Sequence, residues 1–514
     1  LERIKLKMLH SNRTIIPGPP GTGKTYRLIN HHLARELEHT SPDKILYVSF
    51  SNAASNEARN RISMLYPNKE VLVSTLHALG TRELGINTNT QLLQGSNWKG
   101  FKNYSGICQD LEFETITNEN GIPEYRNNYM KVIDYARSKK IPELDDAALE
   151  LDVIDSIDMG LCQQIKQDLE DFKRDFTMFE FSDMISQFVK KDKCPPLDVV
   201  FLDEAQDLSP LQWDMFFYIE SRCKRSYIAG DDDQTIYAFQ GADPTIFINL
   251  EGTLDPQTES RRVPRSVHRV AMSILENVEQ RREKVWIPRD ATGMVVEDAS
   301  LEQLDFSTGN WMILTRTNNQ MKPIVEYMMS LGHRFECKYN PLLPNDLVQA
   351  ISIWNRLNKG ASVSGAEAQQ VYEYLTVKDE QVKYKFSGGK SLDGVDTVDI
   401  DELMLNHGLL VTGSWELLNV TEEQKLHIQE LVASSEDLSK KARIKIATIH
   451  SVKGEECDNV ILFTDLEKII YDSALRDKDT EHRLFFVGVT RAKERLYIMS
   501  HDYDYQYNIG EEII

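Results

Sequence analysis

Long apolar runs and paired cysteines are both missing from this sequence. None of its 514 residues belongs to a run of about eighteen or more apolar residues, the length that a membrane-spanning helix needs. The first residues also lack the charged region, apolar run and cleavage site of a secretory signal. The six cysteines are scattered and form no CxxC pair, which argues against a zinc ribbon or a disulfide framework. We therefore expect a protein of a reducing compartment such as the cytoplasm, with no membrane partner.

An excess of positive charge is missing too. Lysine and arginine together number 59 against 80 acidic residues, which gives a formal net charge of −21. Because phosphate contacts are electrostatic, this balance excludes a generally adhesive nucleic-acid binder, and any nucleic acid must lie in a locally basic or aromatic groove. Hydrophobic residues make up 41% of a chain that is about three to four times the usual length of one domain. Several folded domains are expected.

Short β-rich apolar runs occur in two sets along the chain, interleaved with helix-like segments. Each set is typical of the buried parallel strands of an α/β core. The first set is residues 14–16, 45–50, 199–202 and 227–229, and the second is 311–314, 444–447, 460–463 and 496–499. Two stretches, at about 86–175 and 345–440, are richer in charge and in helical patterning and are interpreted as insertions. The predicted fold is α/β, with two parallel-sheet cores that each carry a mainly helical insertion.

A phosphate-binding loop follows the first predicted strand. Its residues match GxxxxGK[ST] and precede an amphipathic run at 28–37: Gly18-Pro19-Pro20-Gly21-Thr22-Gly23-Lys24-Thr25. Glycines let backbone N–H groups converge on phosphate oxygens at a helix N-terminus, where the helix dipole also favours anions. Lys24 is expected to reach the β- and γ-phosphates of ATP, and Thr25 to supply a hydroxyl to Mg²⁺.

Two acidic residues end the predicted strand at 199–202. Asp203 is the expected second ligand of Mg²⁺, and Glu204 is placed to orient or deprotonate the attacking water. Adjacent acids at strand ends are often merely solvated or capping residues, and here the apolar lead-in favours the functional interpretation. The pattern predicts NTP hydrolysis. The substrate on which the hydrolysis acts has to be inferred from other motifs.

Residues 230–242 resemble motif III of the UvrD/Rep/PcrA group of superfamily 1 DNA helicases, in Gly230-Asp231-Asp232-Asp233-Gln234-Thr235-Ile236-Tyr237-Ala238-Phe239-Gln240-Gly241-Ala242. The resemblance implies that Gln234 touches the γ-phosphate and that Tyr237 and Phe239 face single-stranded bases. Stacking of bases on aromatic rings is sequence-tolerant, which suits a motor that moves along DNA. Ordinary core packing is the alternative for both aromatics.

Other segments are similar to further motifs of the same group. Phe50 to Ala54 resembles motif Ia, with Phe50 and Asn52 as DNA contacts, and Thr75-Leu76-His77 resembles the next DNA-contacting motif. Residues 448–456 resemble motif V, with His450 toward DNA and Glu456 toward ATP, and residues 487–493 resemble motif VI. The group's two arginine fingers are matched by Arg491 in motif VI and by Arg262 in Ser260-Arg261-Arg262-Val263-Pro264. The alternative for each arginine is an ion pair at the surface.

The resemblance also implies a domain order. It divides the chain into core 1A at 1–85 and 176–255, insertion 1B at 86–175, core 2A at 256–344 and 441–514, and a short insertion 2B at 345–440. ATP would be hydrolysed in a cleft between the two RecA-like cores, which close on the nucleotide and reopen.

Several positions depart from the group's pattern. Arg261 stands where a tyrosine commonly stacks on adenine, and Tyr26 stands where an arginine commonly follows the P-loop threonine. Both side chains can stack on a purine, so the two are expected to have exchanged roles. The glutamine that usually reads adenine is not found between Leu1 and Gly18, which leaves base selectivity open.

The favoured interpretation is an ATP- and Mg²⁺-dependent DNA helicase that translocates 3′ to 5′ on single-stranded DNA and unwinds duplex. It would be a DNA- or nucleoid-associated protein, with a protein loading partner possible and an oligomeric state that the sequence leaves open. One alternative is a translocase that displaces proteins without efficient unwinding. Another is a nucleotide-gated binding module with little turnover. Single-stranded RNA also stays open as a substrate.

Overall fold

The chain forms two compact units in the computed structural model. The model describes residues 12–95, 97–107, 111–117, 123–338, 343–384, 392, 396–433, 442–501 and 504–513. Unit 1 comprises Leu1–Met294, Leu466–Glu494 and Tyr503–Ile514, and unit 2 comprises Val295–Asp465 and Arg495–Asp502. Among the described residues, no helix has the length and apolar character to cross a membrane.

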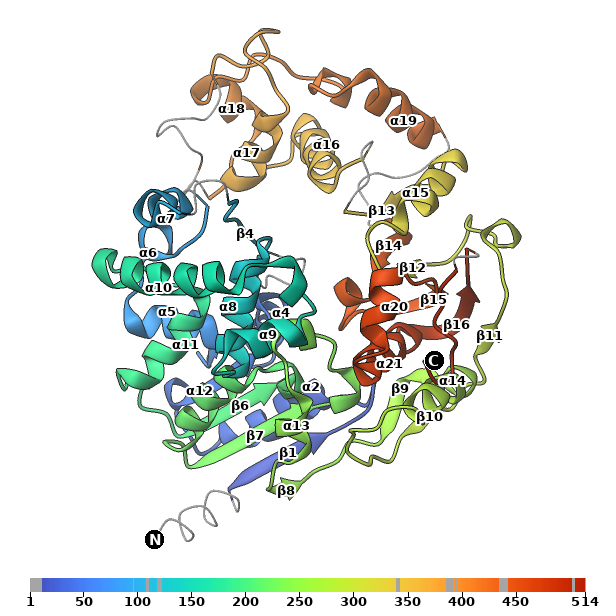
Figure 1. The fold of residues 1–514 in the computed structure, drawn as a ribbon. Coiled ribbons are helices and arrows are strands. Elements are labelled where there is room, and N and C mark those ends of the chain that lie inside the picture. The colour runs from blue at the N-terminus through green and yellow to red at the C-terminus, as the bar shows by residue number, and fades with distance from the viewer. Residues whose placement is uncertain are drawn as a thin grey trace. The chain divides into compact units, whose positions relative to one another are not determined.

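Unit 1 is built on a six-stranded sheet whose paired strands all run parallel. Its order is β3 (Leu72–Ser74), β2 (Ile45–Ser49), β6 (Val199–Asp203), β7 (Arg225–Gly230), β1 (Arg13–Pro17) and β8 (Thr253–Leu254). Strands β2 and β6 are buried at every residue, as expected for a parallel sheet covered on both faces (Figure 1). The strands predicted around residues 14, 45, 199 and 227 are confirmed.

Helices with defined N-caps follow several of these strands. The hydroxyls of Ser51, Thr75 and Ser209 accept backbone N–H groups at the starts of α4 (Asn52–Leu65), α5 (Leu76–Leu84) and α12 (Pro210–Glu220). After the P-loop, α2 (Lys24–Arg27) leads into the amphipathic run predicted at 28–37. This run forms a π-helical turn (Leu28–Leu33) and α3 (Ala34–Glu36). Two further helices, α11 (Phe181–Lys190) and α13 (Pro244–Ile248), belong to the same region.

The first insertion is mainly helical, as predicted. It contains α6 (Thr88–Gln91), α7 (Asn97–Ser105), α8 (Asn128–Lys139), α9 (Leu144–Glu150), α10 (Met159–Phe176) and a small antiparallel pair, β4 (Thr115–Thr117) and β5 (Pro123–Tyr125). These helices bury a core of their own around Trp98, Phe101 and Leu169. The segment therefore folds on its own apolar cluster within unit 1.

Unit 1 also contains segments from later in the sequence. They are β9 (Glu259–Pro264), α14 (Arg265–Leu275), β10 (Ile287–Arg289), α20 (Lys468–Ala474) and α21 (Lys478–Val489). Near the C-terminus, the ring of Tyr507 lies flat on Phe485 with a centroid separation of 3.9 Å. Since Phe485 belongs to α21, the end of the described chain is packed against the helix that precedes Arg491.

A second six-stranded sheet runs in the order β11 (Met294–Val296), β16 (Ala492–Met499), β15 (Cys457–Phe463), β12 (Trp311–Thr315), β14 (Ile444–Thr448) and β13 (Phe335–Glu336). Strand β12 pairs in parallel with β14 and β15, and α15 (Met321–Ser330) follows it in the sequence. The second insertion contributes α16 (Asn345–Asn358), α17 (Gly365–Glu373), α18 (Ile400–Asn406) and α19 (Glu422–Ala433). The glycine, serine and lysine residues at 387–395 predict a loop or flexible turn, and except for Leu392 this run lies outside the described residues. The mixed α/β class with two large sheets, each of six strands, is confirmed.

Candidate nucleotide site and nucleic-acid groove

The P-loop connects the end of β1 to the start of α2. Gly21 and Gly23 adopt positive φ angles of 75° and 84°, a backbone conformation that side chains rarely allow. The ammonium of Lys24 donates to the carbonyl of Gly18 at 2.8 Å, and the hydroxyl of Thr22 donates to the carbonyl of Pro19 at 2.8 Å. The loop is thus closed around the lysine at a helix N-terminus, which is the arrangement that binds phosphate.

Asp203 meets the P-loop threonine at the end of β6. Its Oδ2 accepts hydrogen bonds from Thr25 Oγ1 at 2.7 Å and from Tyr47 Oη at 2.9 Å. Burial, followed by repulsion from Glu204, raises the pKa of Asp203 to about 6. A buried carboxylate with a raised pKa and a hydroxyl beside it is a donor set that suits a hard divalent cation such as Mg²⁺. The structure brings together the two residues that the sequence predicted as metal ligands.

Glu204 has a constrained backbone. Its φ of 56° lies in the left-handed region, and its N–H donates to Asp203 Oδ1 at 3.1 Å. The side-chain amide of Gln206 donates to Glu204 Oε2 at 2.7 Å. A non-glycine residue in this conformation is held there by its surroundings and often marks a functional position. The backbone of Glu204 is therefore bonded to Asp203, and its carboxylate is bonded to Gln206.

A run of hydrogen bonds continues from Gln206 to Arg491. The carbonyl of the Gln206 side chain accepts from the N–H of Asp231 at 2.9 Å, and Asp231 Oδ2 accepts from Gln234 Nε2 at 2.7 Å. Gln234 Oε1 in turn accepts from Arg491 Nη2 at 3.2 Å. Both Gln206 and Arg491 are 0% exposed, so these bonds lie away from competing water. The residues that follow β6, those of motif III and Arg491 of motif VI are consequently connected inside one unit.

Strand β9 packs its backbone against the P-loop. The hydroxyl of Ser260 donates to the carbonyl of Pro20 at 2.9 Å, and the N–H of Arg261 donates to the carbonyl of Gly21 at 2.9 Å. A Cβ atom added at Gly21 would come within 2.5 Å of the Cβ of Arg262, so only glycine fits there. Arg262, one of the expected arginine fingers, therefore lies directly beside the phosphate-binding loop.

Tyr26 and Arg261 form a cation–π pair at the edge of this loop. The guanidinium carbon of Arg261 lies 5.3 Å from the centroid of the Tyr26 ring. Tyr26 is 43% exposed and Arg261 is also exposed, so an incoming planar group has access to both. The two residues predicted to exchange roles are neighbours.

The predicted stacking aromatics form a connected group with unequal exposure. Phe50 stacks on Tyr237 with a centroid distance of 5.3 Å, and Tyr237 lies 6.3 Å from Phe239. Tyr237 is buried, at 3% exposure, whereas Phe239 is 48% exposed. Phe239 is thus open to a base. The buried ring of Tyr237 packs next to Phe50 and Phe239.

Two adjacent cavities, of about 360 and 460 Å³, share Phe50, His77, Phe181 and Gln212 in their walls. Phe239 lines the first cavity and Asn52 the second. Burial lowers the pKa of His77 to about 4, so its imidazole is neutral at physiological pH. Any contact between His77 and a nucleic acid would therefore be a hydrogen bond or a packing contact, because the ring carries no charge to offset a phosphate.

The remaining predicted residues, His450 and Glu456, belong to unit 2. His450 begins a short 3₁₀ turn (His450–Val452) after β14, and the exposed Glu456 immediately precedes β15. Both follow the carboxyl end of β14, the edge of a parallel sheet at which α/β proteins usually carry functional loops.

Four supporting residues were missed by the sequence reasoning. They are Tyr47, Gln206, Asp231 and Lys284, of which the last bonds to Asp231 at 2.7 Å. Asp231 falls inside the quoted motif III and Gln206 comes two residues after Glu204, but the sequence pattern gave neither of them a role. Nothing in the local sequence around Lys284 indicates that it is buried.

Comparison with known proteins identifies similar chains. The family model of the UvrD/REP helicase N-terminal domain matches residues 2–255, and that of the UvrD-like helicase C-terminal domain matches residues 372–503. ATP-dependent DNA helicase PcrA of Bacillus subtilis is 23% identical, with 93% of this chain and 79% of PcrA covered. PcrA of Staphylococcus aureus strain Mu50 is 22% identical, with 94% and 80% covered.

A solved structure aligns more weakly. Arterivirus nonstructural protein 10 (helicase) covers 97% of this chain and 62% of its own, at a TM-score of 0.34 and 11% identity. Similarity at this level has no bearing on the fold.

Proposed function

This chain belongs to the UvrD/REP-like helicase family and is a helicase-class enzyme, and from that premise we propose that it hydrolyses ATP to translocate 3′ to 5′ on single-stranded DNA and to unwind duplex. The polarity follows the family resemblance. A DNA-associated cytoplasmic protein fits this activity.

The hydrogen-bonded run from Glu204 to Arg491 carries the proposal. It joins the residue that would orient the attacking water to Gln234 and to an arginine, through Gln206 and Asp231. A nucleotide-binding module without turnover has no need for such a connection. Preorganised donors and acceptors of this kind stabilise a transition state because they need no rearrangement when charge develops.

Each group then has a chemical role in hydrolysis. Residues 18–25 would hold the phosphates, and Thr25 and Asp203 would hold Mg²⁺, which supplies charge neutralisation when bound. Glu204 would orient the water and accept its proton, while Gln234, Arg262 and Arg491 would face the γ-phosphate. Tyr26 and Arg261 would stack on the base, and Glu456 is a further proposed contact of the nucleotide.

The DNA contacts are proposed around the two cavities. Phe50 and Phe239 offer ring faces to the bases of a single strand, with Asn52 and His77 alongside. Tyr237 acts through Phe50, on which it stacks. His450 is a further proposed contact of the single strand. Since Tyr237 and Gln234 are three residues apart in one loop, a change at the γ-phosphate can reach the bases directly.

Hydrolysis with and without single-stranded DNA tests the proposal. We expect strong stimulation by DNA in the unaltered chain and its loss in Glu204→Gln, with single-stranded RNA as a second substrate control. Unstimulated or absent turnover would contradict the motor and favour a nucleotide-gated binding module. If DNA stimulates turnover, a duplex with a 3′ tail serves as the next substrate. A helicase would unwind this duplex, whereas a translocase that only displaces proteins would leave its strands paired.

A further inference from the structure

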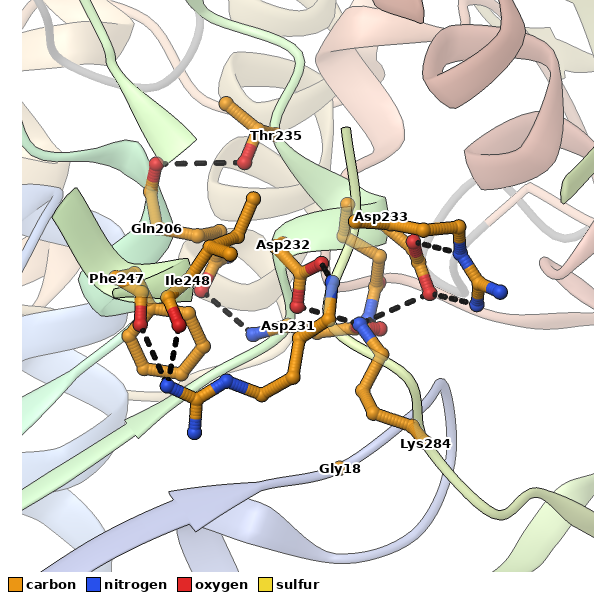
Figure 2. Close-up of polar contacts among 12 residues, drawn as sticks. Gly18, Gln206, Asp231, Asp232, Asp233, Thr235, Phe247, Ile248 and Lys284 are labelled. Atoms are coloured by element: carbon orange, nitrogen blue, oxygen red, sulfur yellow. Dashed lines mark hydrogen bonds and ion pairs between the residues drawn. The ribbon is translucent and has the colours of Figure 1, made fainter. Parts of the chain in front are cut away.

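Three consecutive aspartates after β7 enclose one lysine. The ammonium of Lys284 lies 2.7 Å from Asp231 Oδ1, 2.5 Å from Asp232 Oδ1 and 2.9 Å from Asp233 Oδ2. Figure 2 shows its side chain directed into this group of carboxylates. Its side chain is 4% exposed and those of the aspartates 0–1%. Burial opposes the ammonium form, but the attraction of the three carboxylates outweighs it and raises the pKa of Lys284.

Neighbouring residues bind the same aspartates. The guanidinium of Arg281 pairs with both oxygens of Asp233, at 2.9 and 2.7 Å, and the N–H of Arg282 donates to Asp232 Oδ2 at 2.7 Å. Residues 281–284 are thus bound to each of the three aspartates. The next residue after those aspartates is Gln234.

The other end of this segment is attached to α21. Asp479 accepts the N–H groups of Glu279 and Gln280 at 2.8 and 2.9 Å, and Arg483 donates to the carbonyl of Gln280. Helix α21 leads directly into Thr490 and Arg491. Residues 279–284 therefore form a clamp that binds the aspartate loop at one end and the helix before Arg491 at the other.

We propose that Lys284 is a positioning residue for hydrolysis, holding Asp231 so that the amide of Gln234 presents Oε1 to Arg491. Asp231 uses its two carboxylate oxygens differently: Oδ1 faces Lys284 and Oδ2 accepts from Gln234. If the ammonium were lost, Asp231 would be a buried carboxylate beside two others, and it would turn or take up a proton. The acceptor that fixes the Gln234 amide would then be turned away or weakened, while the P-loop would be untouched.

The inference rests on the proposed ATPase function and is tested with Lys284→Met. We expect DNA-stimulated kcat to fall about ten- to a hundredfold, the range corresponding to one hydrogen bond to a charged group, with KM for ATP nearly unchanged. Arg281→Met is the matched control, because it removes a cation from Asp233, which makes no bond to Gln234. Both variants are expected to lower Tm, but only Lys284→Met lowers kcat.

Coupling to Gln234 separates positioning from plain stabilisation. In a Gln234→Ala background, Lys284→Met should change kcat little further, because its effect acts through the missing amide. Asp231→Asn is the second variant if Lys284→Met does not fold, and it should also lower kcat without raising KM. An unchanged kcat in Lys284→Met, an equal loss in Arg281→Met, or additive losses with Gln234→Ala would each overturn the inference. Absence of DNA-stimulated turnover in the unaltered chain would instead remove the proposed function.

Discussion

Two buried acidic clusters end neighbouring strands of the unit 1 sheet, and they differ in what surrounds them. After β6, Asp203 accepts hydrogen bonds from the hydroxyls of Thr25 and Tyr47, and its pKa is raised. After β7, Asp233 is paired with Arg281 and Lys284, and although burial opposes it, attraction to these cations lowers its pKa, whereas burial raises the pKa of the neighbouring Asp232. The chain supplies cations at the second cluster and hydroxyls at the first.

This difference distinguishes a structural acid from a site for an exogenous cation. A buried carboxylate that the protein itself neutralises is already satisfied, and its removal breaks an internal contact. A buried carboxylate that is held by hydroxyls and has a raised pKa gains most when a cation arrives. The Asp203 cluster therefore has the character of a metal site, and the Asp231–Asp233 cluster that of an internal support.

Replacing one acid from each cluster tests the distinction most strongly. We expect Asp203→Asn to reduce DNA-stimulated ATP hydrolysis by about a hundredfold or more, because several kcal/mol of charge stabilisation by a metal are lost. Its Tm in the absence of nucleotide should not fall, since a buried charge is removed. Asp233→Asn should lower Tm by leaving Arg281 and Lys284 with less compensation. If Asp203→Asn lowered Tm more than Asp233→Asn did, the comparison would be wrong.

The pH dependence of hydrolysis gives a second test of the difference between the two acidic clusters. With a pKa of about 6, raised above its ordinary value, Asp203 is protonated and unable to bind a cation below that pH. Activity should fall about tenfold per pH unit below about 6, and more Mg²⁺ should move this limb to lower pH by competing with the proton. In the absence of metal, the stabilisation from protonated Asp203 is present at low pH and is lost as the pH rises through about 6. An acidic limb insensitive to Mg²⁺ would exclude Asp203 as its cause.

The aromatic group gives a smaller effect that locates the DNA. Phe239→Ala should weaken single-stranded DNA binding about fivefold or more, since stacking contributes about 1–3 kcal/mol per base. Tyr237→Ala is expected mainly to lower Tm, because that ring is buried. Fluorescence anisotropy with a labelled oligonucleotide measures the first effect and thermal unfolding the second. Equal binding losses in both variants would place Tyr237 in contact with the bases as well.

The smallest effect concerns the base of the nucleotide. Tyr26→Ala should raise KM for ATP by a few-fold with kcat retained, as cation–π and stacking contacts at exposed sites contribute about 0.5–2 kcal/mol. Arg261→Ala should behave alike. An unchanged KM for ATP in Tyr26→Ala would show that Tyr26 and Arg261 have not exchanged the role of stacking on the base. The protein would then hold the nucleotide through its phosphates alone.

Sequence patterns predicted the strands, the P-loop and the pairing of Thr25 with Asp203, because those features depend on local hydrophobicity and on motif spacing. They did not predict Lys284, which is 53 positions from Asp231 and resembles a solvated surface residue in its charged surroundings. Burial of Tyr237 with exposure of Phe239 was also beyond the pattern, since both aromatics occupy the same motif. Long-range ionic contacts and the choice between two adjacent rings are decided by tertiary packing.

The left-handed backbone of Glu204 bears on how this enzyme can be engineered. A non-glycine residue at a φ of 56° costs about 1 kcal/mol or more relative to glycine, which adopts that conformation readily. A directed-evolution screen that rewards thermal tolerance alone would accordingly enrich glycine or asparagine at this position and discard the carboxylate that we propose orients the water. Screens for hardier variants of this chain therefore need turnover as a second selection criterion.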